Sequence, residues 1–385
     1  MVELHFRGYL NKEKIEQIKT ENAFRDSLPL EKFIMDFEVL IHIQEVLPDC
    51  IVKGGMAVPF HIQDKTLRRL SVDIDIVTGS SREEVIEAMK KVSEKLKGIV
   101  TIKEPHIPKP TTKNKNKKLP LLTYYCEYKS SIDENPEMKI EIFYGNKMEI
   151  KSKKIDDQIE IIGFLVDFPI SIYEHGSLIG DKLTTLPFNT IGIDPNREID
   201  VPKQIYDIGT LLRSISGKSL MEEIIDAFEK ISSDEISYFI ENKPSFNLVL
   251  EDLNSFSDQM LVTDNQIKLN KSYEGRFDKF TIEMLGKTRY PSYVHVTDIL
   301  LIKVVTKIII KKLENKMNLD TASRKLTEIL DSLGAISKSE PKEKFRLVRQ
   351  YVGKHGKDSS DGKIIKNLLA EQAYLYDQLL EIEKI

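Results

Sequence analysis

The segment from Leu70 to Val77 constrains the fold more than any other part of the chain, because apolar and polar residues alternate along it. A period of two predicts a β-strand with one buried face and one polar face. The polar face carries Ser71, Asp73 and Asp75, and the apolar face carries Leu70, Val72, Ile74 and Ile76. The chain therefore needs a sheet whose far side packs on a core.

Asp73 and Asp75 lie two residues apart on this predicted strand, so both carboxylates project from one face. Two such carboxylates can share a divalent ion, and Mg²⁺ prefers carboxylate and phosphate oxygens as ligands. Nucleotidyl transfer uses an ion of this kind to neutralise charge on the leaving diphosphate. A solvent-facing strand with two acids is the alternative, so the pair needs support from other residues.

A glycine pair, Gly54-Gly55, precedes the acid pair and follows a short predicted strand over residues 50–53. Glycines allow close approach of the backbone, and the N-terminus of the helix predicted after them presents free N–H groups to a triphosphate. An ordinary strand-to-helix turn is the alternative for the glycines alone. Together with the acid pair they predict a nucleotide site.

Four motifs stand in order along the chain, at residues 53–57 (KGGMA), 69–76 (RLSVDIDI), 180–186 (GDKLTTL) and 203–208 (KQIYDI). In sequence and order they resemble the signature of the AbiEii family of nucleotidyltransferase-like proteins, which includes the MenT-type toxins. The resemblance covers roughly residues 30–215.

The resemblance implies a nucleotidyltransferase fold of the DNA polymerase β type, with Asp73 and Asp75 as ligands of Mg²⁺ or Mn²⁺ and an NTP as donor. It also implies that Lys182 binds the triphosphate and that Asp207 is needed for activity. The acceptor that it implies is the 3′ end of a tRNA or another RNA, and the implied protein partner is a cognate antitoxin.

Lys182 and Asp207 each have a simpler explanation. Lys182 falls in a predicted helix, where an isolated lysine is usually solvated. Asp207 lies four residues after Lys203, a spacing that favours a plain helical ion pair. The family's Arg-Asp stands here as Lys203-Gln204, and lysine lacks the bidentate fork of arginine.

Glu141 is the best placed third carboxylate, because it shares one face of a predicted strand over residues 138–144 with Lys139. A surface pair between strands explains the same pattern, so a metal ligand and a structural acid both stay open. Arg69 and Ser71 approach the face of the aspartates. We interpret them as nucleotide-binding residues, with purely structural roles as the alternative.

The length of 385 residues exceeds the roughly 250–300 at which a single core stops growing, which predicts two domains. Strand and helix patterns mix up to about residue 214, and the rest is predicted to be almost entirely helical. We therefore expect an α/β (α+β) nucleotidyltransferase domain over residues 1–214 and a helical bundle domain over residues 215–385.

The net charge of −4 argues against a wholly basic nucleic-acid-binding protein but allows local basic patches. One candidate patch is the predicted loop 108–118. A second contains Lys342, Lys344, Arg346, Arg349, Lys354 and Lys357. Solvated surfaces are the alternative for both patches.

Two cysteines, Cys50 and Cys126, are too few for a disulfide framework, which suits a reducing cytoplasm. The apolar stretch 299–310 is too short to span a bilayer, and lysines recur every four residues along it, so no membrane partner is expected.

These features together predict a Mg²⁺-dependent enzyme that moves a nucleotide from an NTP onto an acceptor. The family resemblance implies that this enzyme is the toxin of a toxin–antitoxin pair or an abortive-infection system. One alternative is transfer to a small molecule or a protein. The other is a catalytically silent nucleotidyltransferase fold that serves as a binding or scaffold module.

Overall fold

The structure is a computed structural model, and it describes residues 4–106, 117–133, 136–145, 149–194, 196–197, 199–215, 220–263, 267–286 and 290–385. The chain forms two compact units. Unit 1 comprises Met1–Leu178, Ser237–Lys243 and Thr281–Arg289, and unit 2 comprises Ile179–Ile236, Pro244–Phe280 and Tyr290–Ile385. The boundary falls inside helix α5 (His175–Leu183). The division into folding domains at residue 214 stays a prediction.

Unit 1 is built on a mixed sheet, which has seven strands within the described ranges, in the order β3-β4-β5-β2-β1-β9-β6. Their bounds are β1 (Ile51–Val52), β2 (Asp73–Val77), β3 (Val100–Ile102), β4 (Leu121–Tyr128), β5 (Glu137–Phe143), β6 (Ser152–Ile155) and β9 (Ile170–Tyr173). Strand β2 runs parallel to β5 and antiparallel to β1. The strand with the acid pair is therefore central and has a neighbour on each side.

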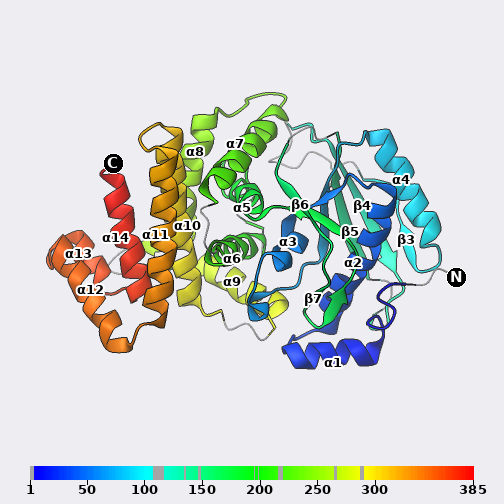
Figure 1. Ribbon diagram of the computed structural model, residues 1–385, viewed down its shortest axis with the longest axis horizontal. Coiled ribbons are helices and arrows are strands. Elements are labelled where there is room, and N and C mark those ends of the chain that lie inside the picture. Colours follow the sequence, from blue (N-terminus) through cyan, green and yellow to red (C-terminus); the bar gives the residue numbers. More distant parts are fainter. Residues whose placement is uncertain are drawn as a thin grey trace. The chain divides into compact units, whose positions relative to one another are not determined.

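Helices α2 (Ser27–Val46) and α4 (Arg82–Lys95) cover the sheet of unit 1, with α2 packed against β2 and α4, and α1 (Lys12–Asn22) packs against α2 (Figure 1). A small ribbon, β7 (Ile159–Ile161) and β8 (Phe164–Val166), closes the core near the N-terminal residues. Aromatic rings meet edge to face there, with 5.3 Å between the ring centres of Phe33 and Phe37. The apolar faces of α2 and β2 thus share one core.

Several predicted elements of unit 1 are confirmed. Strand β5 lies one residue from its predicted position, and β4 pairs with it in antiparallel register. Helix α4 begins with a capping box in which Ser81 and Glu84 exchange hydrogen bonds. Of the predicted loop 108–118, residues 108–116 lie outside the described residues.

The predicted strand over residues 70–77 begins only at Asp73. The backbone N–H of Leu70 donates to the carbonyl of Met284, 3.2 Å away, so this part of the chain leaves the sheet. Arg69 and Ser71 are buried beside it. The alternation of polar and apolar residues therefore extends beyond the strand, because residues just before Asp73 are buried by contacts outside the sheet.

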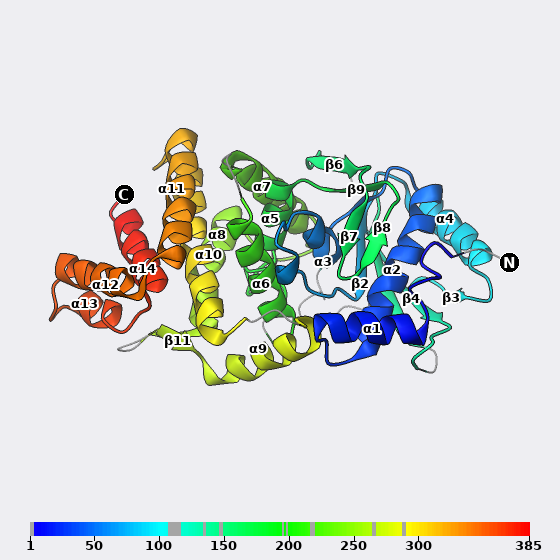
Figure 2. The same cartoon turned by 60° about the horizontal axis from the view of Figure 1, so that its bottom comes forward.

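Unit 2 is mainly helical, and the last residues of α7 and α9 belong to unit 1. The helices after α5 are α6 (Asp200–Arg213), α7 (Met221–Ser237), α8 (Phe246–Ser255), α9 (Lys271–Met284), α10 (Ser292–Leu313), α11 (Leu319–Lys338), α12 (Pro341–His355), α13 (Ser360–Ile365) and α14 (Ala370–Glu383). Helix α10 packs against α6, α8, α11 and α14, while α12 and α13 pack together beside α14 (Figure 2).

Helix α10 confirms the expected lysine stripe, because Lys303, Lys307 and Lys311 are partly exposed amid a buried apolar surface. A short antiparallel pair, β10 (Leu261–Thr263) and β11 (Ile267–Leu269), packs next to it. Among the described helices, none is both long and apolar enough to cross a membrane.

Candidate active site

The acid pair lies on the accessible face of β2. Asp73 and Asp75 are partly exposed, whereas Ile74 and Ile76 between and beyond them are fully buried. The predicted alternation is confirmed over this stretch. Both carboxylates therefore leave the sheet on the same side, with the hydrophobic core behind them.

Strand β5 places two charged residues next to the acid pair. In the parallel register Asp73 faces Lys139 and Asp75 faces Glu141. The Lys139 ammonium lies 2.9 Å from the Glu141 carboxylate. Burial opposes the charged form of Lys139, but the carboxylates of Glu141 and Asp73 outweigh it and raise its pKa. Lys139 is thus held by carboxylates on both its own strand and β2.

Glu141 forms an ion pair with Lys139 on its own strand. Among the described residues, no three or more His, Cys, Asp or Glu side chains form a group that could hold a metal ion. Asp73 and Asp75 as ligands of a divalent ion, whose shell phosphate oxygens and water would complete, stay a prediction. Glu141 as a third metal ligand stays a prediction.

The glycine turn is held directly against the acid pair. Gly54 has a φ of +64°, and a Cβ atom at this residue would lie 2.1 Å from the Asp75 Oδ2 atom. The Lys53 N–H donates to the Asp75 carbonyl over 2.9 Å. Only glycine combines this backbone conformation with so close an approach. Helix α3 (Gly54–Ala57) begins at the pair, as predicted, and is one turn long.

Gly55 makes a similar contact with the two residues predicted to bind nucleotide. A Cβ atom at Gly55 would lie 2.3 Å from the Ser71 Oγ atom and 2.8 Å from a guanidinium nitrogen of Arg69. Arg69 is 2% exposed and donates to the Leu70 carbonyl over 2.6 Å. These contacts favour a structural role for Arg69 and Ser71, in which they support the glycine turn. Nucleotide binding by either residue stays a prediction.

Asp36 on α2 is a buried acid near the pair that we did not predict. The side chain is fully buried, and in the described part of the chain neither carboxylate oxygen has a hydrogen-bond partner. Burial raises the pKa of Asp36 well above its ordinary value, and the negative charges of Asp73 and Asp75 add to the effect. An acid between two large apolar residues, Met35 and Phe37, was the signal in the sequence.

Lys182 and Asp207, from the two later motifs, pair with each other inside unit 2. The Lys182 Nζ atom donates to Asp207 Oδ2 over 2.7 Å and to Gln204 Oε1 over 3.2 Å. The two charged side chains are 2% and 0% exposed. Lys203 instead lies 3.4 Å from Asp200, so the simple Lys203–Asp207 pair is not the contact that accounts for Asp207. Gln204, where the family motif has Asp, contributes a neutral acceptor.

A buried polar network also holds α6, which carries Asp207. Asp298 on α10 pairs with Arg213 at the end of α6 and accepts a 2.6 Å hydrogen bond from the Tyr290 hydroxyl. His295 lies between the hydroxyls of Tyr290 (2.9 Å) and Tyr273 (2.7 Å). Burial lowers the pKa of His295 to about 3, so the ring is neutral. The sequence had suggested no role for His295.

The family comparison agrees with these motifs. A family model described as nucleotidyl transferase AbiEii toxin, type IV toxin–antitoxin system, matches residues 40–293. This stretch is more than half of the chain and contains both the acid pair and the Lys182–Asp207 pair. The chain belongs to the AbiEii family.

AbiEii membership confirms the predicted resemblance and carries it beyond residue 215. It identifies the chain as a nucleotidyl transferase of a toxin family, which implies a nucleotide substrate and a cognate antitoxin. None of the curated proteins compared with the chain matches it. Helices α11 to α14 lie past the end of the AbiEii match.

Proposed function

We propose that this AbiEii protein transfers a nucleotide from an NTP to an acceptor hydroxyl, with a divalent ion held by Asp73 and Asp75. The observation that carries the proposal is the approach of Gly54 to Asp75, which no other residue could make without a clash. An ordinary strand surface does not require a glycine turn in such close contact with two partly exposed carboxylates. It suits a surface that receives a metal-bound triphosphate.

In this mechanism the acceptor hydroxyl attacks the α-phosphorus, the bond to the bridging oxygen breaks, and diphosphate leaves with that oxygen. The ion, when bound, neutralises charge on the leaving diphosphate. Asp73 and Asp75 hold the ion on one face of the rigid central strand. The glycine turn keeps side chains away from that face, and Lys139 limits the repulsion among the neighbouring carboxylates.

We propose that Lys182 binds the triphosphate and that Asp207 is needed for activity. Both roles rest on the resemblance of their motifs to those of the AbiEii family. The ion pair between them means that neither charge acts independently, because loss of one leaves the other buried without compensation. We also propose the DNA polymerase β type for the nucleotidyltransferase fold. The central mixed sheet with the acid pair on an inner strand supports this assignment.

For the acceptor we propose the 3′ end of a tRNA, and for the ion Mg²⁺ or Mn²⁺. The rival acceptors are a small molecule and a protein. A catalytically silent binding module is less well supported, since the close contact between Gly54 and the acid pair is kept intact.

The test is incubation of the protein with each NTP, labelled in turn at the α- and γ-phosphate, with Mg²⁺ or Mn²⁺ and separately with total RNA, a metabolite extract or a protein extract. We expect α-label to enter RNA and γ-label to leave as diphosphate. Transfer of γ-label would indicate a kinase instead. Label in the metabolite or protein fraction alone would reassign the acceptor, and no transfer under any condition would favour the silent module.

A further inference from the structure

Helix α12 presents an exposed face that is both basic and aromatic. Lys342, Phe345, Arg346 and Arg349 follow the i, i+3, i+4, i+7 spacing that puts side chains on one face of a helix, and all four are exposed. Phe345 is 59% exposed, which is unusual for an aromatic ring on a helix. The Arg349 guanidinium lies 4.4 Å from the centre of this ring. We call these four residues the α12 platform.

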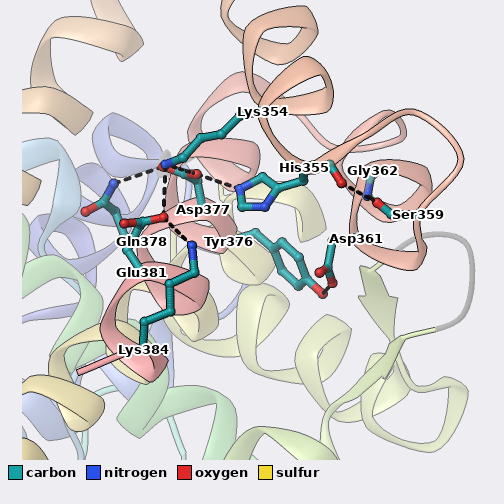
Figure 3. A network of polar contacts seen from close by, with 10 residues as sticks. All are labelled: Lys354, His355, Ser359, Asp361, Gly362, Tyr376, Asp377, Gln378, Glu381 and Lys384. Carbon is teal, nitrogen blue, oxygen red and sulfur yellow. Dashed lines mark hydrogen bonds and ion pairs between the residues drawn. The ribbon is translucent and has the colours of Figure 1, made fainter.

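The opposite side of α12 is fixed to α14. Lys354 lies 2.7 Å from Asp377 and 3.2 Å from Glu381, and His355 lies 2.7 Å from the same Asp377 carboxylate (Figure 3). Near the start of the helix, Lys344 pairs with Glu371 on α14 over 2.9 Å. Polar contacts at both ends of α12 therefore determine which face of the helix is exposed.

The basic cluster predicted from the sequence thus separates into two groups. Lys344 and Lys354 have structural ion pairs, whereas Lys342, Arg346 and Arg349 form none with the described residues. In the sequence of α12, Glu343 is the only acid. The unpaired cations surround Phe345, so charge and an accessible ring coincide on one rigid surface.

We propose that the α12 platform binds single-stranded RNA, with a base stacked on Phe345 and the backbone phosphates beside Lys342, Arg346 and Arg349. Single-stranded nucleic acids are bound by aromatic rings flanked by cations, since every base has a face that can stack. An acidic protein would use the three cations but would have no need for the ring. This inference deepens the proposed function and rests on its RNA acceptor.

The platform lies in α12, past the end of the stretch that matches the AbiEii model. Acceptor recognition here would then be a property of this chain rather than of the shared enzyme core. The partner class follows from the combination of charge and exposed ring, and the sequence of the RNA is left to the experiment.

The test is fluorescence anisotropy of a labelled, mixed-sequence single-stranded RNA with the full chain, over a range of salt concentrations and without NTP or metal. Phe345→Ala should weaken binding about 5- to 150-fold, the range for loss of one stacked base, and leave the salt dependence unchanged. Phe345→Tyr keeps the ring and should bind like the parent. The triple Lys342/Arg346/Arg349→Gln variant should weaken binding and flatten the salt dependence by up to about 2 in log–log slope.

The matched control is a triple Lys90/Lys91/Lys97→Gln variant, which removes the same charge from exposed positions on and just after α4. It should bind RNA like the parent, and thermal unfolding should show that every variant is folded. Parent-like RNA binding by both Phe345→Ala and the platform triple would overturn the proposal. So would a triple variant that loses binding to polyglutamate but not to RNA, because the partner would then be an acidic protein.

The same anisotropy series on Asp73→Asn separates this proposal from the proposed function. We expect that variant to bind RNA normally and to transfer nothing. Normal transfer to RNA by the platform variants, with unchanged RNA affinity, rejects the platform and leaves the enzyme assignment in place.

Discussion

The acid pair of unit 1 and the Lys182–Asp207 pair of unit 2 hold their charges in opposite ways. Asp73 and Asp75 are partly exposed and lie beside Lys139 and Glu141 of the neighbouring strand. Asp207 is fully buried and has a cation 2.7 Å away. The first arrangement keeps two acids accessible from solvent, whereas the second buries its acid against a cation. Removal of an aspartate should therefore affect the stability of the protein very differently at the two places.

The largest effect on stability should come from Asp207→Ala. The substitution leaves the Lys182 ammonium buried without its counter-charge, which typically costs about 3–5 kcal/mol. Urea unfolding of the parent and the variant measures this difference. The double variant Lys182→Met/Asp207→Leu removes both charges and should recover most of the loss. An Asp207→Ala protein as stable as the parent would show that the pair is not neutralised as described.

Gly54→Ala should have the next largest effect, roughly 2–4 kcal/mol, because it combines an unfavourable positive φ with a collision against the Asp75 carboxylate. Gly98→Ala is the matched control, since Gly98 also has a positive φ but nothing within 4 Å of its Cβ position. It should lose only about 1 kcal/mol. Equal losses in the two variants would mean that the approach of the turn to Asp75 has no energetic weight.

The glycine turn and the Asp207 ion pair differ in how far the sequence predicts them. The period-two pattern located the acid pair, and the glycines located the turn, because both follow from local geometry. The partner of Asp207 could not be read from spacing, since a lysine four residues away and one on another helix look equally suitable until the helices pack. The burial of Asp36 and the network around His295 were missed for the same reason: both depend on how the helices pack, although the apolar neighbours of Asp36 were a signal.

Asp36→Asn should change how stability depends on pH. The unfolded chain loses the Asp36 proton above about pH 4, while burial keeps it on the folded protein, so folded Asp36 costs stability as pH rises from about 4 toward its raised pKa. The variant lacks this cost. Its stability relative to the parent should grow steadily as the pH rises from 4 to 8. A difference that is constant with pH would contradict the raised pKa.

The smallest effect on stability should come from Asp75→Asn. The side chain is partly exposed, so thermal unfolding should shift by the equivalent of less than about 1 kcal/mol in either direction. Asp157→Asn, at an exposed position away from β2, provides the matched control. A loss of several kcal/mol in Asp75→Asn but not in Asp157→Asn would show that Asp75, like Asp207, is needed for the stability of the fold.

The most direct test of the account is the rate at which α-labelled NTP is transferred to RNA by the parent, Asp75→Asn and Asp157→Asn proteins under the same Mg²⁺ concentration. We expect the parent and Asp157→Asn to transfer label at equal rates, and Asp75→Asn to be slower by a factor of about 100 or more, since it removes a metal ligand but leaves the fold intact. Transfer by folded Asp75→Asn at the rate of the parent would contradict the central claim that the acid pair on β2 holds the ion for catalysis.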